Sequence, residues 1–321
     1  MLRRKPYLEV PNMSRALAAL LFTALPLSLT ACLDTTDESS VDQAATGEQG
    51  LNGAPEHLFK GKDAKPGGGG GGSPQLTFHG GTVLTASRTQ AIFWGSEWNS
   101  AAFAGDKITG LDTFFNGFGG SLYAGASTEF SGSNGPVTSA STYLGHVFDS
   151  SAAPTRALTT SSAVAEACKV SNNAPDSGAL YLIYTSTGAG HVSYCAWHSW
   201  GSCSNGALVQ VAYMPNIDGI AGCDPGDVSG LHSQGLAAVA NVTAHELSEA
   251  ITDPRGSGWT DSGGSENGDK CAWRFSPNNG GVVTLSNGSR WKLQGEWSNA
   301  AYTASSGYPN SSGQLACLPF N

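Results

Sequence analysis

A long helical pattern occupies residues 233–252 of the chain. When successive positions are set about 100° apart, a mostly apolar set of side chains falls on one side of this helix: Leu236, Ala240, Thr243, Leu247 and Ile251. His245 and Glu249 fall on the opposite side, one turn apart. Pro254 removes a backbone donor and biases Asp253 away from helical angles, so we expect the helix to end there.

Shorter patterns predict further strands and helices. Runs of β-branched and aromatic residues between turn formers predict strands at residues 82–85, 90–94, 179–185, 207–213, 282–285 and 291–294. Helical spacing of apolar residues predicts helices at residues 106–118 and 161–170. Together these elements predict a single α+β domain over residues 75–321, with a mixed β-sheet, many loops and the long helix buried inside it.

The first 74 residues have a different character. Residues 16–29 form an apolar run of 14, too short to cross a bilayer and typical of the core of a signal peptide. The run leads into Leu29-Thr30-Ala31-Cys32, which resembles the lipobox of bacterial lipoproteins; a plain secretory signal is the alternative. Residues 32–74 are small and acidic at first and later contain six consecutive glycines. We therefore expect a lipoprotein signal peptide at residues 1–31, a lipidated Cys32 that anchors the protein to a membrane, and a flexible tether at residues 32–74.

Composition limits the functions that are open to the domain. The chain of 321 residues has 43 glycines, only 13% charged residues and a formal net charge of −9. A basic nucleic-acid surface is therefore excluded as its main function. This makeup is typical of an exported protein, here expected at a bacterial cell surface or in the periplasm.

The chain has seven cysteines, an odd number for an exported protein. If Cys32 carries a lipid, six remain that can close three disulfides in an oxidising compartment: Cys168, Cys195, Cys203, Cys223, Cys271 and Cys317. They form no Cys-x-x-Cys pairs, which disfavours a cysteine zinc knuckle. The connectivity stays open, except that we predict a bond between Cys271 and Cys317 that holds the loop after the long helix to the C-terminus.

The candidate chemistry lies on the long helix, in the order His245-Glu246-Leu247-Ser248-Glu249. This is the layout of the HExxH zinc helix with the second histidine replaced by glutamate. Two ligands one turn apart can bind one zinc ion, and the carboxylate of Glu246 beside them can take a proton from water. The alternative is a solvated helix face. However, residues 231–252 contain no Lys or Arg to pair with the glutamates, so a cation or a water-filled cleft is expected to offset their charge.

A zinc site needs a third protein ligand, and the glycine-rich loop after the helix offers three carboxylates: Asp261, Glu266 and Asp269. The same oxygens could instead bind calcium, although the loop lacks the ligand order of an EF-hand. His198 and His232 are further candidate ligands and His79 is a candidate catalytic residue; the alternative for each is a hydrogen-bonded structural histidine. The absence of a Gly-x-Ser-x-Gly elbow excludes a serine hydrolase centred on Ser248.

Six blocks in the same order resemble the phosphate-induced protein or EXORDIUM-like family, secreted proteins best known from plant cell walls. The blocks are FHGGTVLT followed by AIFWG, then YLIYTS, CAWHS, VTAHELSEAITDP, ENGDKC and WKLQGEWSNA, spread over residues 78–300. The family pattern of HELAE followed by E-x-(G/A)-D-x-C falls here on six positions: His245, Glu246, Glu249, Glu266, Asp269 and Cys271. Asn267 departs from the aliphatic residue usual in the family. The resemblance implies a secreted, wall-associated protein and does not imply a reaction.

The sequence thus predicts an exported, lipid-anchored, zinc-dependent peptidase with a zincin-like active-site helix. In this hypothesis His245, Glu249 and either Asp269 or Glu266 bind zinc, and Glu246 is the general base for water attack on a peptide or protein substrate. The alternative is a non-catalytic cell-surface module that binds wall material and uses the same residues to hold a structural ion.

Overall fold

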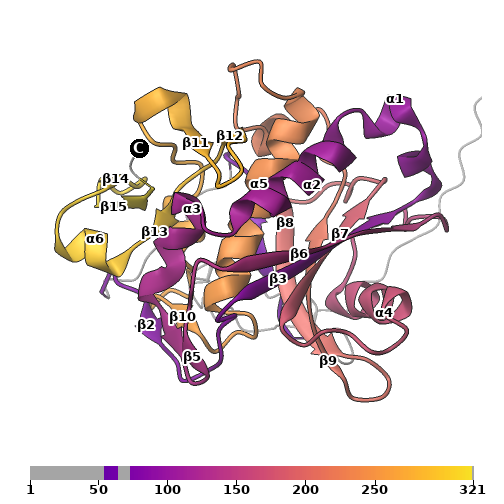
Figure 1. Ribbon diagram of the computed structural model, residues 1–321, viewed down its shortest axis with the longest axis horizontal. Helices are drawn as coiled ribbons and strands as arrows, with labels where there is room; N and C mark the ends of the chain where they lie inside the picture. Colours follow the sequence, from indigo (N-terminus) through magenta and orange to yellow (C-terminus); the bar gives the residue numbers. More distant parts are fainter. Residues whose placement is uncertain (1–53, 64–72, 320–321) are drawn as a thin grey trace, which may run out of the picture. The chain divides into compact units, whose positions relative to one another are not determined.

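The computed structural model describes residues 54–63 and 73–319, and its centre is a six-stranded sheet in the order β1-β8-β9-β7-β3-β6 (Figure 1). The strands are β1 (His57–Lys60), β3 (Ser87–Trp94), β6 (Ser141–Asp149), β7 (Ala179–Thr185), β8 (Tyr194–Ser202) and β9 (Leu208–Met214). Strands β6, β3, β7 and β9 run parallel. Strands β8 and β1 add two antiparallel pairs at one edge. The expected α+β class with a mixed sheet is confirmed.

Helices cover both faces of this sheet (Figure 1). Helix α2 (Lys107–Phe118) lies between β3 and β6 in the chain, and α4 (Thr160–Val170) lies between β6 and β7. Helix α2 packs with α5 (Gln234–Thr252) over the larger hydrophobic core, whereas α4 packs on β8 and β9 over a second core. Every residue of β7 is buried between these layers, as expected for a central parallel strand.

Helix α5 is the long helix that the apolar repeat predicts, and it is buried on all sides. The Ser233 hydroxyl accepts a hydrogen bond from the Leu236 N–H at its start, and Asp253, before Pro254, ends it. All residues from Leu236 to Thr252 are buried, including the ionisable ones. The alternative of a solvated helix face is therefore wrong. The polar side of α5 packs against β1, β8 and the loop that follows the helix.

Short elements make up the rest of the described chain. Before α5 they are β2 (Thr77–Phe78), α1 (Ala101–Ala104), α3 (Leu122–Gly125), β4 (Ser131–Gly132) and β5 (Gly135–Pro136). After α5 they are β10 (Trp259–Thr260), β11 (Val282–Thr284), β12 (Arg290–Lys292), β13 (Glu296–Trp297), α6 (Asn299–Thr303), β14 (Tyr308–Pro309) and β15 (Leu315–Leu318). β15 pairs with both β13 and β14 and so ties the C-terminal segment together.

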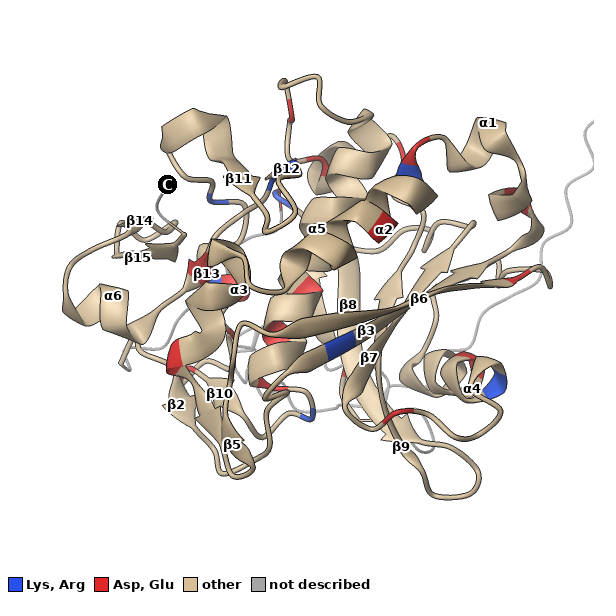
Figure 2. Ribbon diagram, viewed as in Figure 1, with Lys and Arg blue, Asp and Glu red and all other residues tan. Residues whose placement is uncertain are grey.

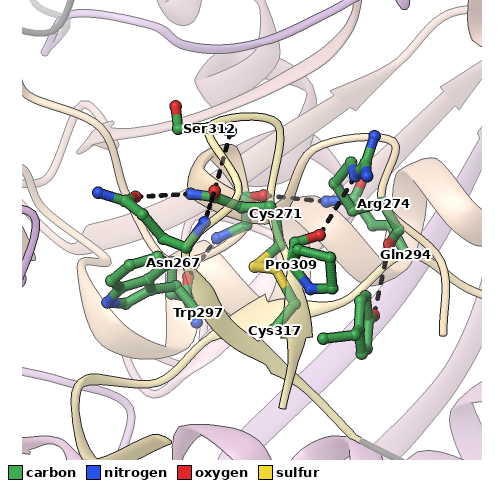
Figure 3. Close-up of a disulfide and its surroundings, with 12 residues drawn as sticks. Asn267, Cys271, Arg274, Gln294, Trp297, Pro309, Ser312 and Cys317 are labelled. Atoms are coloured by element: carbon green, nitrogen blue, oxygen red, sulfur yellow. Dashed lines mark hydrogen bonds between the residues drawn. A yellow bond between two sulfur atoms is a disulfide. The ribbon is translucent and has the colours of Figure 1, made fainter. Parts of the chain in front are cut away.

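Three disulfides cross-link the second half of the chain. The bond between Cys271 and Cys317 joins the loop after α5 to β15 (Figure 3), and this predicted pairing is confirmed. The other two bonds are Cys168–Cys203 and Cys195–Cys223. Such bonds indicate a protein that folds in an oxidising compartment.

The predicted elements are present with one exception. The structure has helices and strands at each predicted position other than residues 82–85. There the backbone of Val83 bonds to the Asn134 side chain, and the Leu84 N–H bonds to the Ile251 carbonyl, so no neighbouring strand pairs with it. Three strands of the central sheet, β1, β6 and β8, were not predicted.

Part of the segment predicted to be a tether is folded. Residues 54–63 lie within the range 32–74, yet they provide the edge strand β1, in which Phe59 is fully buried. The stretches on either side of it are rich in small residues and glycine, and they hide this short apolar pattern. The expected signal peptide and Cys32 lie outside the described residues. Within the described ranges, the helices are too short or too polar to cross a membrane.

Candidate metal centre

Seven ionisable side chains meet beside the C-terminal half of α5. They come from β1, β8, α5 and the loop after α5: His57, His198, His245, Glu246, Glu249, Glu266 and Asp269. They form three overlapping groups, in each of which three possible ligand atoms lie within 4.8 Å of one another. All are buried except His57 and Asp269, which are partly exposed. Figure 2 shows acidic residues on this part of α5, a helix without Lys or Arg.

The first group contains the predicted ligands His245, Glu249 and Asp269. His245 Nε2 lies 3.1 Å from Glu249 Oε1 and 3.9 Å from Asp269 Oδ1. Glu249 Oε1 also accepts a hydrogen bond of 2.9 Å from the Asp269 N–H. The i, i+4 spacing on α5 brings the first two side chains together, and the turn after the helix adds the third.

Gln294 determines where the proton of the His245 ring lies. Its amide nitrogen donates to the Gly268 carbonyl at 3.0 Å and lies 2.8 Å from His245 Nδ1. Its amide oxygen accepts from the Trp273 N–H at 3.1 Å. Turning the amide over would set donor against donor and acceptor against acceptor, so His245 Nδ1 must be an acceptor.

The protonation of His245 disfavours it as a metal ligand. Burial lowers the pKa of His245 to about 4, so the ring is neutral near pH 7 and its one proton is on Nε2. A metal ion needs a lone pair at the ligating nitrogen, and a ligand histidine ordinarily donates from its other ring nitrogen. His245 is held in the opposite tautomer, with its Nε2–H facing Glu249.

His198, on the antiparallel strand β8, has one ring nitrogen beside a carboxylate and the other free of hydrogen bonds, which is the arrangement expected of a metal ligand. Its Nδ1 lies 3.0 Å from Glu246 Oε2, and both side chains are buried. An ionised Glu246 can only accept, so Nδ1 is then the donor and the lone pair is on Nε2. This Nε2 makes no hydrogen bond and lies 3.6 Å from Glu266 Oε2. Burial, and then the neighbouring Glu249, raises the pKa of Glu246 well above its usual value, so Glu246 orients His198 as a ligand once a cation keeps it ionised.

His57 and Glu266 complete a group with His198. His57 Nδ1 lies 3.1 Å from Glu266 Oε2, and its ring stacks on that of His198 with 4.8 Å between centroids. Neither oxygen of the buried Glu266 carboxyl accepts a well-formed hydrogen bond. Two imidazoles and one carboxylate are a ligand set of catalytic zinc sites.

The cluster holds more carboxyls than it can ionise by itself. Burial, and then the neighbouring Glu249, raises the pKa of Glu266 well above its usual value. Burial also raises the pKa of Glu249 to about 8 and that of Asp269 to about 7. Among the ion pairs of the described residues, none joins these carboxyls to Lys or Arg. Buried His and Glu groups of this kind could hold a metal ion, whose positive charge would replace the missing cation.

Three other candidates from the sequence lie outside the cluster. Asp261 pairs with Lys270 at 2.7 Å. The His232 ring nitrogen Nε2 lies 2.8 Å from a backbone carbonyl, and His79 Nε2 lies 2.9 Å from the hydroxyl of Thr260. Both histidines therefore have the structural role that was the alternative for them.

Sequence reasoning missed His57 and gave His198 little weight. His57 lies in the expected tether, and only the pairing of β1 with β8 brings it to the cluster. No alternation of polar and apolar residues marks His198, because β8 is buried on both faces; in the structure His198 shares with Ala196 the face of β8 that looks toward α5.

Comparisons with known proteins give no family for this chain. No protein-family model, no curated protein and no solved structure matches it. The resemblance to the EXORDIUM-like family and the zincin-like character of α5 therefore stay predictions.

Proposed function

We propose that this protein is an exported metal-dependent peptidase, in which His198 and Glu266 bind the metal ion and His57 is the third ligand in the described arrangement. The observation that carries the proposal is His198 Nε2, a buried ring nitrogen without a hydrogen-bond partner that lies beside the equally unpartnered oxygens of Glu266. His245 Nε2 also has no well-formed hydrogen bond, but the contact of His245 Nδ1 with Gln294 places the ring proton on it. Each such atom costs about 1 to 3 kcal/mol if it stays unpaired. A network with a purely structural role would be expected to satisfy them.

The chemistry of the ligand atoms favours zinc. Two imidazole nitrogens and a carboxylate suit zinc and related transition metals, whereas calcium prefers oxygen ligands throughout. A divalent ion in this place would supply Lewis-acid activation of a peptide carbonyl and of water.

Glu249 is the proton acceptor that we assign. Its Oε1 is held by the Asp269 N–H at 2.9 Å and faces His245 Nε2, while its Oε2 lies 3.7 Å from His198 Nδ1. Burial raises the pKa of Glu249 to about 8 in the cluster by itself, and a bound cation nearby would lower it, so that the carboxylate could accept a proton near neutral pH. His245 then positions Glu249, and Glu246 positions His198.

Bound zinc and peptide cleavage, measured side by side in matched histidine variants, test the proposal. We expect His198→Ala to lose metal and activity, and His245→Ala to keep the metal but lose activity. His232→Ala is the control, because this histidine lies outside the cluster. Loss of metal in His245→Ala but not in His198→Ala would support the ligand set predicted from the helix. A metal-loaded wild type that cleaves no peptide in a broad library would instead favour a non-catalytic module with a structural ion.

A further inference from the structure

Strand β1 is attached to the sheet edge through its main chain. In the antiparallel register His57 lies opposite His198, and Phe59 lies opposite Ala196. Main-chain bonds continue beyond both ends of the strand: the Ala54 N–H donates to the Trp200 carbonyl at 3.3 Å, and the Gly61 N–H donates to the Ser193 carbonyl at 3.1 Å. Such bonds do not depend on side-chain identity, so another extended chain could make the same ones.

The side chains of β1 alternate between the two faces of the sheet. His57 and Phe59 point toward α5, whereas Leu58 packs against the second core on the other face. The Phe59 ring is fully buried and stacks on the His245 ring, with 3.6 Å between centroids. It also stacks on Trp273 at 4.6 Å. Strand β1 thus presents one imidazole and one aromatic ring to the centre.

The side chains of His57 and Phe59 cover two histidines of the candidate metal centre. The His57 ring lies over His198, and the Phe59 ring lies over His245. Without β1, the metal group would keep His198 and Glu266 and lose its third ligand. The site of Phe59 would open beside His245, and β8 would become an unprotected strand edge.

We infer that the edge of β8 is the binding site for an extended peptide, and that strand β1 of the same chain fills this site in the structure. The peptide adds to β8 as an antiparallel strand and places an aromatic side chain in the Phe59 position. β1 must leave before such a peptide can reach His198 and Glu266. The inference deepens the proposed function, on which it rests for the fate of the bound peptide, whereas the docking step needs no catalysis.

If the full-length chain is cut between β1 and the rest of the domain, an added peptide can replace β1 on the edge of β8. The six consecutive glycines between β1 and the rest of the domain are replaced by the recognition sequence of a specific protease, and the folded protein is cut there. Binding of a fluorescent peptide with the sequence of residues 54–63 is then measured by anisotropy, with and without zinc. We expect saturable binding to the nicked chain and little binding to the intact chain, because the attached strand competes at high effective concentration.

Substitutions placed in the peptide leave the folded protein unaltered. Phe59→Ala in the peptide should weaken binding by about 30-fold, as for a buried aromatic anchor. Zinc should strengthen binding of the unchanged peptide by roughly tenfold or more, and His57→Ala should remove this increase. Leu58→Ala is the matched control and should bind within about threefold of the unchanged peptide, because its side chain is only partly buried on the other face.

The outcomes separate the docking step from the peptidase. Equal binding by intact and nicked chains, no binding by the nicked chain, or an equal loss for Leu58→Ala and Phe59→Ala would overturn the inference. Binding without cleavage would keep the docking site and refute the peptidase. Equal cleavage of test peptides by intact and nicked chains would keep the peptidase and refute the role of β1.

Discussion

Replacement of Glu246 by glutamine separates the two roles that this residue could have. In the role predicted from the helix pattern, Glu246 takes a proton from water and does not hold the metal. In the structure its Oε2 lies 3.0 Å from His198 Nδ1, where it orients a ligand ring. Glu246→Gln removes the charge but keeps an oxygen that can accept from Nδ1. Because the variant is a neutral isostere of a buried carboxyl, we expect it to fold.

The size of the effect follows from the bond that is weakened. A buried hydrogen bond to a charged group contributes about 1.5 to 3 kcal/mol, and a neutral one contributes about 1 kcal/mol. The difference of about 0.5 to 2 kcal/mol corresponds to roughly 2- to 30-fold in the dissociation constant of the metal. Loss of a general base would instead lower the rate by about 10² to 10⁴ without weakening the metal.

Both quantities can be measured on the same preparation. Zinc affinity is obtained by competition with a chromophoric chelator, and turnover is obtained with the metal site saturated. We expect weaker zinc binding, with most of the activity recovered at saturating zinc. If zinc affinity stays within about threefold of wild type while turnover at saturation is lost, then Glu246 is the base and our assignment of Glu249 is wrong.

Three further predictions concern the surroundings of the site. A methyl group at Gly268 would lie 2.9 Å from atoms of Glu249 and His245, so Gly268→Ala should lower turnover by about tenfold or more. A methyl group at Gly125 would point into open space, so Gly125→Ala is the control and should not lower turnover. Equal turnover of the two variants would contradict this reasoning. The bond between Cys271 and Cys317 closes a separation of 46 residues, so replacing both by serine should lower the free energy of unfolding by about 4 kcal/mol; an unchanged urea midpoint would argue against this. Burial raises the pKa of Glu296 from 4.5 to about 8, so its contribution to stability is complete below pH 4.5 and is lost as the pH rises through 8. Wild type should therefore lose stability relative to Glu296→Gln by at most about 1.4 kcal/mol per pH unit between pH 5 and 8; parallel curves of urea midpoint against pH would refute this.

The helix and its chemistry could be predicted because their determinants are local. The apolar repeat of α5, its start at Ser233 and its end before Pro254 all lie in one stretch of sequence. The i, i+4 spacing of His245 and Glu249 is part of that stretch, so their proximity follows from helix geometry alone.

The choice of ligand atoms could not be predicted because it depends on distant contacts. The proton of His245 is positioned by Gln294, which is 49 residues away in the chain. Strand β8 is buried on both faces and so has no alternation of polar and apolar residues that would reveal it. His57 reaches the centre only through the register between β1 and β8, a pairing of segments far apart in sequence.

The arrangement of the disulfides has a mechanical consequence. The first two overlap in the sequence, so residues 168–223 form one cross-linked segment, and the third closes a separate segment at residues 271–317. Residues 73–167, which include β3, α2 and β6, are enclosed by none of them, and neither are residues 224–270, which include α5 and the loop after it. When the oxidised chain is pulled from its ends, these two parts can extend fully, whereas residues 168–223 and 271–317 keep much of their length hidden behind the cross-links. Reduction would release that length, so the contour length of the unfolded chain becomes a direct measure of its redox state.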